Sequence, residues 1–176
     1  MRITGGIFRG RNLHPPQNLP VRPTTDFAKT ALFNILNNYF DFTELDILDL
    51  FAGAGSITYE FLSREVKSAT CVDQNYHCIE YIKKMSAELK VSNVQCVRAN
   101  AFKFAGKAER QWDIIFADPP FAEEQTDKLP DMIFEKNLLK EGGWLIVEHN
   151  SKRTLKSTIL PFDKRDYGSC GLSMYK

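Results

Sequence analysis

Short runs of apolar residues alternate along this chain with longer segments in which apolar positions recur about every 3.6 residues. The short runs are typical of strands that a parallel sheet buries on both faces, and the longer segments are typical of amphipathic helices. Strands are predicted at residues 47–51, 69–73, 94–98, 114–117, 144–147, 162–167 and 172–175. Because helical segments separate the first five strands, the pattern indicates an α/β chain with a doubly wound sheet.

The helical segments carry their own start and stop signals. Thr25 or Asp26 can cap the first predicted helix. Its apolar side is expected to hold Phe27, Ala31, Leu32, Ile35, Leu36 and Tyr39. The next two helices are expected to bury Ile57, Phe61 and Leu62, and then Ile79, Ile82 and Leu89. Pro130 suits the first turn of a last helix, which should run towards Leu138 and stop at the Gly142-Gly143 pair.

The two ends of the chain predict hairpins. Residues 168–171 form a turn of small residues between the last two strands, so the final strand should run antiparallel to its neighbours. Residues 1–25 predict a β-hairpin around Gly5-Gly6, followed by an extended arm that Pro15 and Pro16 help to hold. Residues 26–176 are then expected to form the main domain.

The fourth predicted strand stops abruptly at Asp118-Pro119-Pro120-Phe121. Prolines cannot donate ladder hydrogen bonds, and ligands of open α/β sheets bind beyond the carboxyl ends of the strands. The Asp118 carboxylate and the Pro119 carbonyl can accept both hydrogens of an exocyclic amine. The tetrapeptide resembles the catalytic motif of methyltransferases that modify exocyclic or amide nitrogens. This resemblance implies that the nitrogen lone pair is aimed at a methyl donor while Phe121 stacks on the base. An ordinary strand-ending turn is the alternative interpretation.

A glycine turn, Phe51-Ala52-Gly53-Ala54-Gly55, follows the first predicted strand. Its glycines let the backbone approach a ligand without a Cβ clash. Thr58 stands where a dinucleotide fingerprint has its third glycine, and no Gly-Lys-Ser/Thr follows. Neither a dinucleotide site nor a phosphate-cradling P-loop is therefore predicted.

Polar residues also follow the next two strands. Asp73 can accept both ribose hydroxyls of an adenosine, and capping the following helix is its alternative role. Asn100 and the backbone amide of Ala101 can read an adenine edge. The N-terminus of the helix after Thr25 offers free N–H groups to an anion such as a carboxylate.

The formal net charge is only +1, but the charges are segregated. Residues 1–25 contain four bases and no acid, residues 151–176 carry a net +4, and the segment between them carries −7. Basic ends around an acidic body fit a protein that meets a phosphate backbone with its ends. The alternative is that these charges are solvated and have no role in binding a phosphate backbone.

Several classes of protein are not supported by the sequence. No apolar run approaches 18 residues, and the first residues lack the apolar segment of a signal peptide. The chain is therefore expected to be cytoplasmic, with no membrane partner. The four cysteines lack Cys-x-x-Cys spacing and the three histidines are isolated, so reduced thiols and no metal site are expected.

The motifs together resemble the RsmD family of bacterial rRNA methyltransferases over nearly the whole chain. The resemblance is carried, in this order, by Arg2-Ile3-Thr4-Gly5-Gly6 with Arg9-Gly10-Arg11, Arg22-Pro23-Thr24-Thr25-Asp26, Leu32-Phe33-Asn34-Ile35-Leu36, Asp49-Leu50-Phe51-Ala52-Gly53-Ala54-Gly55, Glu60-Phe61-Leu62-Ser63-Arg64, Asp118-Pro119-Pro120-Phe121 and Tyr167-Gly168. It implies a class I S-adenosylmethionine-dependent methyltransferase fold, a Rossmann-like seven-stranded sheet whose last strand is antiparallel. It also implies N2-methylation of one guanine in 16S rRNA of the small ribosomal subunit or its assembly intermediate, with S-adenosylhomocysteine as product.

The residue patterns and the resemblance together predict three sets of site residues. The catalytic set is Asp118, Pro119, Pro120 and Phe121. The cofactor-binding set is Thr25, Asp49, Phe51, Gly53, Gly55, Asp73, Gln74, Asn100 and Ala101, in which Asp49 would face the methionine end. The substrate-binding set is Arg2, Arg9, Arg11, Arg22 and Phe121. Asn100 departs from the Asp that is usual in the wider superfamily.

Two other functions fit the same residues. The tetrapeptide also serves enzymes that methylate adenine N6 in DNA or a glutamine amide in protein. The arginine-rich N-terminal segment favours nucleic acid over protein, and no separate domain is present to read DNA. A ribosome-assembly factor that binds RNA without catalysis is the remaining alternative, although the intact Asp118 and both turn glycines argue against loss of activity.

Overall fold

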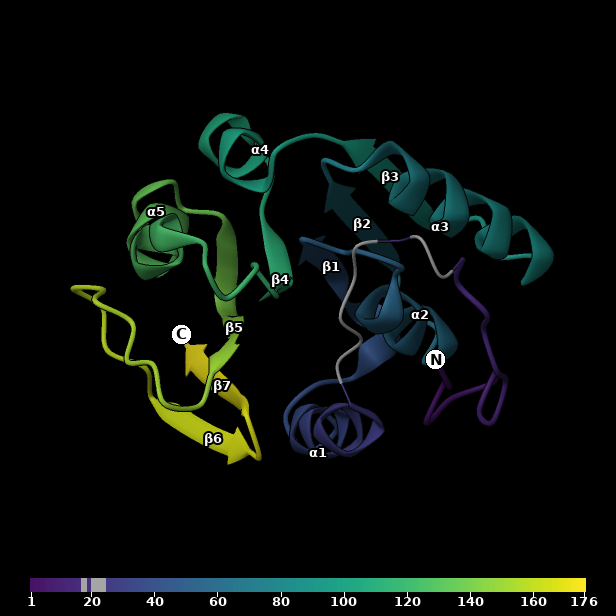
Figure 1. Cartoon of the computed structure of the whole chain (residues 1–176), viewed down its shortest axis with the longest axis horizontal. Helices are drawn as coiled ribbons and strands as arrows, with labels where there is room; N and C mark the ends of the chain where they lie inside the picture. Colours follow the sequence, from purple (N-terminus) through teal and green to yellow (C-terminus); the bar gives the residue numbers. More distant parts are fainter. Residues whose placement is uncertain (17–18, 20–24) are drawn as a thin grey trace.

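The computed structural model describes residues 1–16, 19 and 25–176, and these form a seven-stranded sheet flanked by helices (Figure 1). The strands are β1 (Asp46–Leu50), β2 (Ser68–Asp73), β3 (Val94–Arg98), β4 (Trp112–Ala117), β5 (Leu139–Asn150), β6 (Asp163–Tyr167) and β7 (Cys170–Tyr175). Their order across the sheet is β3-β2-β1-β4-β5-β7-β6, with β1 to β5 parallel and β7 antiparallel to both of its neighbours. This topology confirms the predicted fold class.

Helices cover both faces of the sheet, as Figure 1 shows. The face covered by α1 (Asp26–Leu36), α2 (Ser56–Ser63) and α3 (Tyr76–Glu88) encloses one apolar core, which includes Phe116 and Ile146. The face covered by α4 (Ala101–Lys107) and α5 (Leu129–Glu135) encloses the other, which includes Ala117 and Val147. Two short 3₁₀ helices, η1 (Phe42–Glu44) and η2 (Glu124–Lys128), join these elements.

The first helix begins as predicted but turns a different side inwards. The Thr25 hydroxyl accepts a hydrogen bond from the Ala28 N–H at 3.2 Å, which caps α1. Phe27 and Tyr39, which were expected to be buried, are 71% and 67% exposed. The predicted Leu32 and Leu36 are buried, and α1 also buries Ala28, Lys29 and Phe33. The spacing of apolar residues did not predict this side of α1, because one of the buried positions is occupied by a charged residue, Lys29.

The predicted last helix is shorter than expected, and the strand after it is longer. The helix α5 ends at Glu135, Asn137 adopts a left-handed backbone conformation, and β5 begins at Leu139 and runs through both glycines. A Cβ on Gly143 would lie 2.9 Å from the carbonyl oxygen of Asp113. The glycine pair therefore lets β5 pack against β4, where the register shifts, and does not stop a helix.

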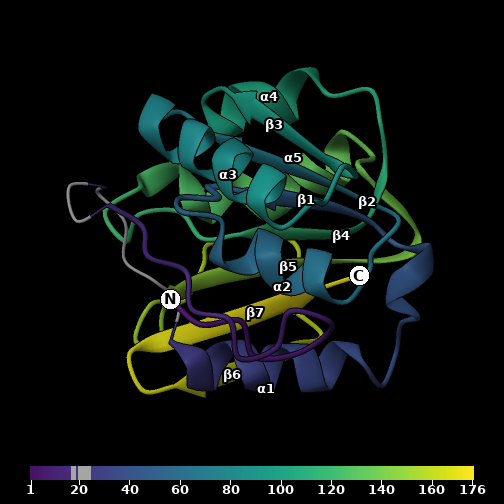
Figure 2. The ribbon, with the colours of Figure 1, turned by 90° about the vertical axis from the view of Figure 1, so that its right-hand side faces the viewer.

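The N-terminal segment contains much less β-hairpin than the sequence predicted. One isolated antiparallel bridge joins Arg2 to Asn12, while residues 5–10 form turns and bends. Ile3 and Leu13 are 2% and 1% exposed and belong to the same core as α1 and α2. Figure 2 shows this segment running beside both helices. Its fixed position therefore depends more on packing against the main body than on strand pairing.

The Gly5-Gly6 pair packs against the end of α2. A Cβ on Gly6 would lie 1.8 Å from the carbonyl oxygen of Ser63, and Gly6 has a φ of +75°. This close approach lets the Ile7 N–H donate to that carbonyl at 2.7 Å, while the Ser63 hydroxyl donates to the Gly5 carbonyl at 2.5 Å. The glycines therefore serve a tertiary contact between segments far apart in sequence.

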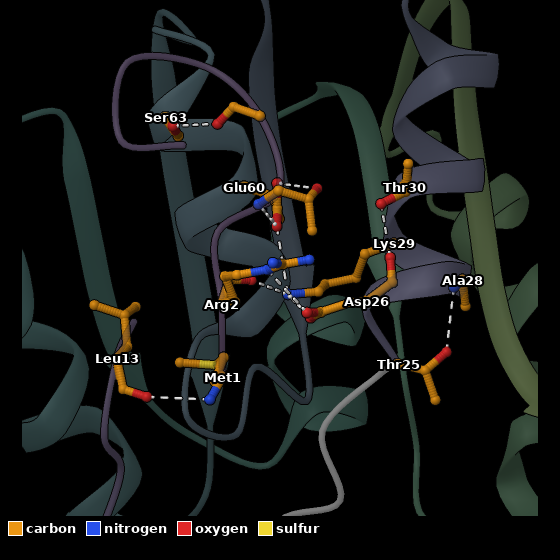
Figure 3. Close-up of polar contacts among 12 residues, drawn as sticks. Met1, Arg2, Leu13, Thr25, Asp26, Ala28, Lys29, Thr30, Glu60 and Ser63 are labelled. Atoms are coloured by element: carbon orange, nitrogen blue, oxygen red, sulfur yellow. Dashed lines mark hydrogen bonds and ion pairs between the residues drawn. The ribbon is translucent and has the colours of Figure 1, made fainter. Parts of the chain in front are cut away.

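A buried ionic network ties the same segment to α1 and α2 (Figure 3). The Glu60 carboxylate is fully buried and accepts hydrogen bonds from the Thr4 N–H at 2.8 Å and from Arg64 at 2.7 Å. The Lys29 ammonium, 1% exposed, lies 3.3 Å from Glu60 and donates to the Arg2 carbonyl at 2.6 Å. Removing one partner of such a buried pair costs about 3–5 kcal/mol, so the network holds the N-terminus firmly.

Candidate active site

A cavity of about 550 Å³ opens at the carboxyl edge of the parallel strands, where open α/β sheets bind ligands. It brings together predicted site residues from four strand ends. Those that line it are Asp49, Phe51, Gly53, Asp73, Gln74, Asn100, Ala101, Asp118, Pro119, Pro120 and Phe121.

Five predicted residues do not line this cavity. Thr25 caps α1, and Gly55 ends the glycine turn as the N-cap residue of α2. Arg9 and Arg11 are exposed on the N-terminal segment. Arg2 is also exposed, but its guanidinium lies 3.3 Å from the Asp26 carboxylate, so the expectation that no acid neutralises it was wrong. Arg22 lies outside the described residues.

The glycine turn after β1 runs through left-handed backbone conformations. Phe51, Gly53 and Gly55 have φ values of 63°, 54° and 80°. A Cβ on Gly55 would lie 2.9 Å from the Tyr59 ring and 3.0 Å from Ile82, so this glycine permits close packing of α2 and α3. Gly53 instead lines the cavity, where its backbone is open to a ligand.

Asp73 joins the ends of β1 and β2. Its carboxylate accepts hydrogen bonds from the Gly53 N–H at 2.8 Å and from the Asn75 N–H at 2.7 Å. The α3 helix is capped by Asn75, whose side chain accepts from the N–H groups of His77 and Cys78, so the alternative role of Asp73 as helix cap is wrong. Asp73 therefore fixes the glycine turn and still presents oxygen lone pairs to the cavity.

Asp49 is the most buried acid of the cavity lining, at 2% exposed. The Thr58 hydroxyl donates to its carboxylate at 2.6 Å. Burial raises the pKa of Asp49 to about 7, although the hydrogen bonds from Thr58 work in the opposite direction. Thr58 thus holds an acid in place at the position where a dinucleotide fingerprint would need glycine.

Asp118 extends β4 by one backbone hydrogen bond, from its N–H to the Leu50 carbonyl at 3.3 Å. The loop that follows is held by Arg153, which comes from the segment after β5. Its guanidinium donates to the carbonyls of Phe121 at 3.1 Å and Glu123 at 3.2 Å, and pairs with Asp127 at 3.0 Å. The Asp118-Pro119-Pro120-Phe121 turn is therefore fixed from both sides.

Comparisons with known proteins agree with this geometry. The sequence model of a family described as "Conserved hypothetical protein 95" matches residues 1–176. The chain is 33% identical to the putative rRNA methyltransferase YlbH of Bacillus subtilis, over 100% of this chain and 98% of that protein. It is 36% identical to ribosomal RNA small subunit methyltransferase D of Escherichia coli, over 84% of this chain and 71% of that protein.

The chain belongs to the RsmD family of rRNA methyltransferases. Among solved structures, the putative methyltransferase yhhF from Escherichia coli superposes with a TM-score of 0.86 at 27% identity, covering 99% of this chain and 96% of that one. A Thermus thermophilus 16S rRNA N2 G1207 methyltransferase, solved with AdoMet and guanosine, has a TM-score of 0.69 at 16% identity, covering 90% of this chain and 45% of that one, which supports the fold alone.

This RsmD-family chain works with S-adenosylmethionine, and its cavity fits that group. The cavity volume lies within the range of about 300–1,000 Å³ that small-molecule sites occupy. The Ser56 hydroxyl at its wall is buried without a hydrogen-bond partner among the described residues. A ligand with polar groups can satisfy that oxygen.

Sequence reasoning missed several residues of this RsmD-family site. Glu148 on β5 is 6% exposed and lines the cavity, as do Met1 and Ser56. Glu148 directly follows the predicted strand at residues 144–147, but it belongs to no motif that the sequence offers. Arg153 was missed because the two carbonyls to which it donates lie about 30 residues earlier in the sequence.

Neither a metal site nor a membrane span emerges from the described part of the chain. Within residues 1–16, 19 and 25–176, no three His, Cys, Asp or Glu side chains group as a metal ion would require. No helix among these residues has the length and apolar character to cross a bilayer.

Proposed function

We propose that this rRNA methyltransferase transfers a methyl group from S-adenosylmethionine to N2 of a guanine in 16S rRNA, within the small ribosomal subunit or its assembly intermediate. The observation that carries the proposal is the Asp118-Pro119-Pro120-Phe121 turn on the wall of a cavity that also contains the glycine turn of β1. An amine acceptor and a methyl donor can therefore meet in one space.

The proposed cofactor orientation follows the cavity wall. Asp73 would accept the ribose hydroxyls with the lone pairs left by its two backbone donors. Gln74, Asn100 and Ala101 would lie along the adenine, although the Asn100 side chain also caps α4 by accepting the Lys103 N–H at 3.0 Å. Asp49 and Phe51 would face the methionine end. Thr25 is not part of this proposed orientation because it lies off the cavity.

The reaction needs an amine whose lone pair points at the methyl group. Bound S-adenosylmethionine supplies an electrophilic methyl group and leaves as S-adenosylhomocysteine. The Asp118 carboxylate and the Pro119 carbonyl accept the two amine hydrogens and favour the positive charge that develops on nitrogen. Phe121 stacks on the base, and the excess proton then passes from the methylated amine to solvent water.

The basic N-terminal segment would meet the RNA backbone. Met1 lines the cavity, while the exposed Arg9 and Arg11 lie in the part of the segment that packs near Ser63 at the far end of α2, so an RNA whose target base enters the cavity would contact them by extending along this segment. Such contacts position the nucleic acid without reading its sequence.

The test is to incubate unmodified small-subunit particles with the protein and labelled S-adenosylmethionine, and then to analyse the nucleosides by mass spectrometry. Label in N2-methylguanosine from 16S rRNA is the expected result. Label in N6-methyladenosine or in a protein fraction would show that the acceptor is adenine or protein and not guanine. An absence of label would favour a non-catalytic role. A parallel incubation with naked 16S rRNA decides whether the assembled particle is required.

A further inference from the structure

A second carboxylate lies next to the proposed catalytic turn. Glu148 belongs to β5, is 6% exposed and lines the same cavity as Asp118. We propose that Glu148 selects guanine by accepting the hydrogen on ring nitrogen N1, while Asp118 holds the neighbouring N2 amine. The inference rests on the proposed function and assigns the base selectivity of that site to one residue.

The register of the sheet puts the two acids side by side. Ala117 of β4 pairs with Val147 of the parallel strand β5, so the next residues along the two strands are Asp118 and Glu148. Neighbouring strands lie about 4.8 Å apart, so two side chains at the same level of β4 and β5 can both reach one ligand.

Both acids also project to the same face of the sheet. Phe116 and Ile146 belong to the core under α1, α2 and α3, and side chains along a strand alternate between faces. Residues 118 and 148, two positions further on, therefore return to that face. Leu172, which lies opposite Glu148 on β7, belongs to the same core and supports this orientation.

The chemistry of the bases makes such a pair selective. Guanine presents the N1 hydrogen and the N2 amine as adjacent donors, so two ionised carboxylates match it with acceptors only. Adenine presents its amine beside a ring nitrogen that is itself an acceptor, which a second carboxylate repels. Asp118 alone would bind the amine of guanine or of adenine equally well. Glu148, in contrast, would be left buried without a hydrogen bond when adenine is bound, and this penalty strongly favours guanine.

The comparison with Glu60 separates this role from that of a buried structural acid. Glu60 is also buried, but its donors are Thr4, Lys29 and Arg64 of the protein, and it does not line the cavity. Glu148 has an open side towards the ligand. The proposal requires one Glu148 oxygen to face the base, whatever contacts the carboxylate makes within the protein.

The experiment compares two bases in particles whose 16S rRNA carries either guanine or 2,6-diaminopurine at the methylated position. Diaminopurine keeps the N2 amine but has an acceptor at N1. The parent protein should prefer guanine, and Glu148→Gln, which can donate to N1, should shift the kcat/KM ratio towards diaminopurine by about tenfold or more. Cofactor affinity should stay within about twofold, because the altered contact is with the base.

Two matched variants complete the test. Glu148→Asp keeps an acceptor and should retain the preference for guanine, even with a lower rate. Glu124→Gln makes the same change at an exposed acid of the neighbouring loop that does not line the cavity, and should leave the base ratio unchanged. If Glu148→Gln slows both bases equally, or changes neither, the proposed selectivity is wrong. If the parent does not methylate guanine N2, the proposed function fails, and the role of Glu148 fails with it.

Discussion

The two edges of the parallel sheet both carry aspartates, but their surroundings differ. At the amino edge, Asp46 and Asp113 share the Lys140 ammonium at 2.7 and 2.8 Å, and Arg110 lies 2.9 Å from Asp46. Burial tends to raise the pKa of Asp46, but hydrogen bonds from Lys140 and Ser68 outweigh it and lower that pKa overall. These acids are neutralised by cations of the chain itself.

At the carboxyl edge, the described donors to Asp49 and Asp73 are neutral groups. Asp49 is bound by the Thr58 hydroxyl, and Asp73 by two backbone N–H groups. Among the residues that the structure describes, no lysine or arginine forms an ion pair with either acid. The contrast indicates that acids at the amino edge stabilise the fold, whereas acids at the cavity are arranged to meet a ligand.

The sharpest test of this contrast uses the two ends of β4. Asp118→Asn should lower methyl transfer by at least ~100-fold, by comparison with the loss of a single charge-stabilising group at an active site. Cofactor affinity should remain within a few fold, because the partner of Asp118 is the acceptor amine. Single-turnover rates and calorimetry with S-adenosylhomocysteine measure the two quantities.

Asp113→Asn is the matched control for that variant. It makes the same chemical change at the other end of the strand, where Asp113 pairs with Lys140, and should retain nearly the full rate. Full turnover by a folded Asp118→Asn protein would mean that the Pro-Pro turn only ends the strand. Equal losses in both variants would remove the distinction between the two edges.

A somewhat smaller effect is expected for cofactor binding at the ends of β1 and β2. Asp73→Ala should weaken affinity by about 1.5–3 kcal/mol, because charge-assisted hydrogen bonds to the ribose and the support of Gly53 are both lost. Isothermal titration gives the affinity, and Asp46→Ala, at the amino edge of β1, serves as control. An unchanged affinity in folded Asp73→Ala would exclude Asp73 from the cofactor site.

The contrast between edges also explains what could be read from the sequence. The strand ends at Asp118 and Asp73 were predictable because local signals mark where each strand stops. Both acids follow an apolar run, and two prolines follow Asp118. Glu148 was not predictable, because its place beside Asp118 follows from the pairing of β4 with β5. The buried Lys29 was missed for a similar reason, since its partner Glu60 lies on another helix.

The N-terminal arginines should have a moderate effect on RNA binding. Replacing Arg9 and Arg11 with alanine should reduce the slope of log K against log salt by about 1.4, since each phosphate contact on single-stranded RNA contributes about 0.7. Binding to small-subunit particles at several salt concentrations measures the slope. Arg2 is left out of the variant because it pairs with Asp26.

Lys107→Ala with Lys136→Ala provides the control for the arginine pair. Both lysines are exposed, and they lie at the ends of α4 and α5, on the face of the sheet opposite the N-terminal segment. The same loss of charge there should leave the slope nearly unchanged. An identical slope change in the two double variants would indicate a general charge effect and no RNA surface at the N-terminus.

The smallest expected effect is on the pH dependence of stability, and it should have opposite signs for two acids on β1. The pKa of Asp46 is lowered by folding, so its stabilisation is present above the unfolded value of about 4 and is lost as pH falls through the folded pKa. The pKa of Asp49 is raised to about 7, so its stabilisation is present below about pH 4 and is lost as pH rises towards 7. Urea unfolding of the cofactor-free protein between about pH 2 and pH 8 measures both.

Relative to the parent, Asp49→Asn should therefore gain stability as pH rises from 4 to 7 and then level off, because asparagine carries no charge that burial penalises. Asp46→Asn should instead be less stable than the parent near neutral pH, and this deficit should disappear in acid. A change of about 1 kcal/mol moves the melting temperature of a chain of this size by about 2–4 °C, so thermal unfolding offers an independent measurement. If the two variants change stability in the same direction across this range, the acids at the two ends of β1 lie in similar environments, and the contrast between the two edges of the sheet does not hold.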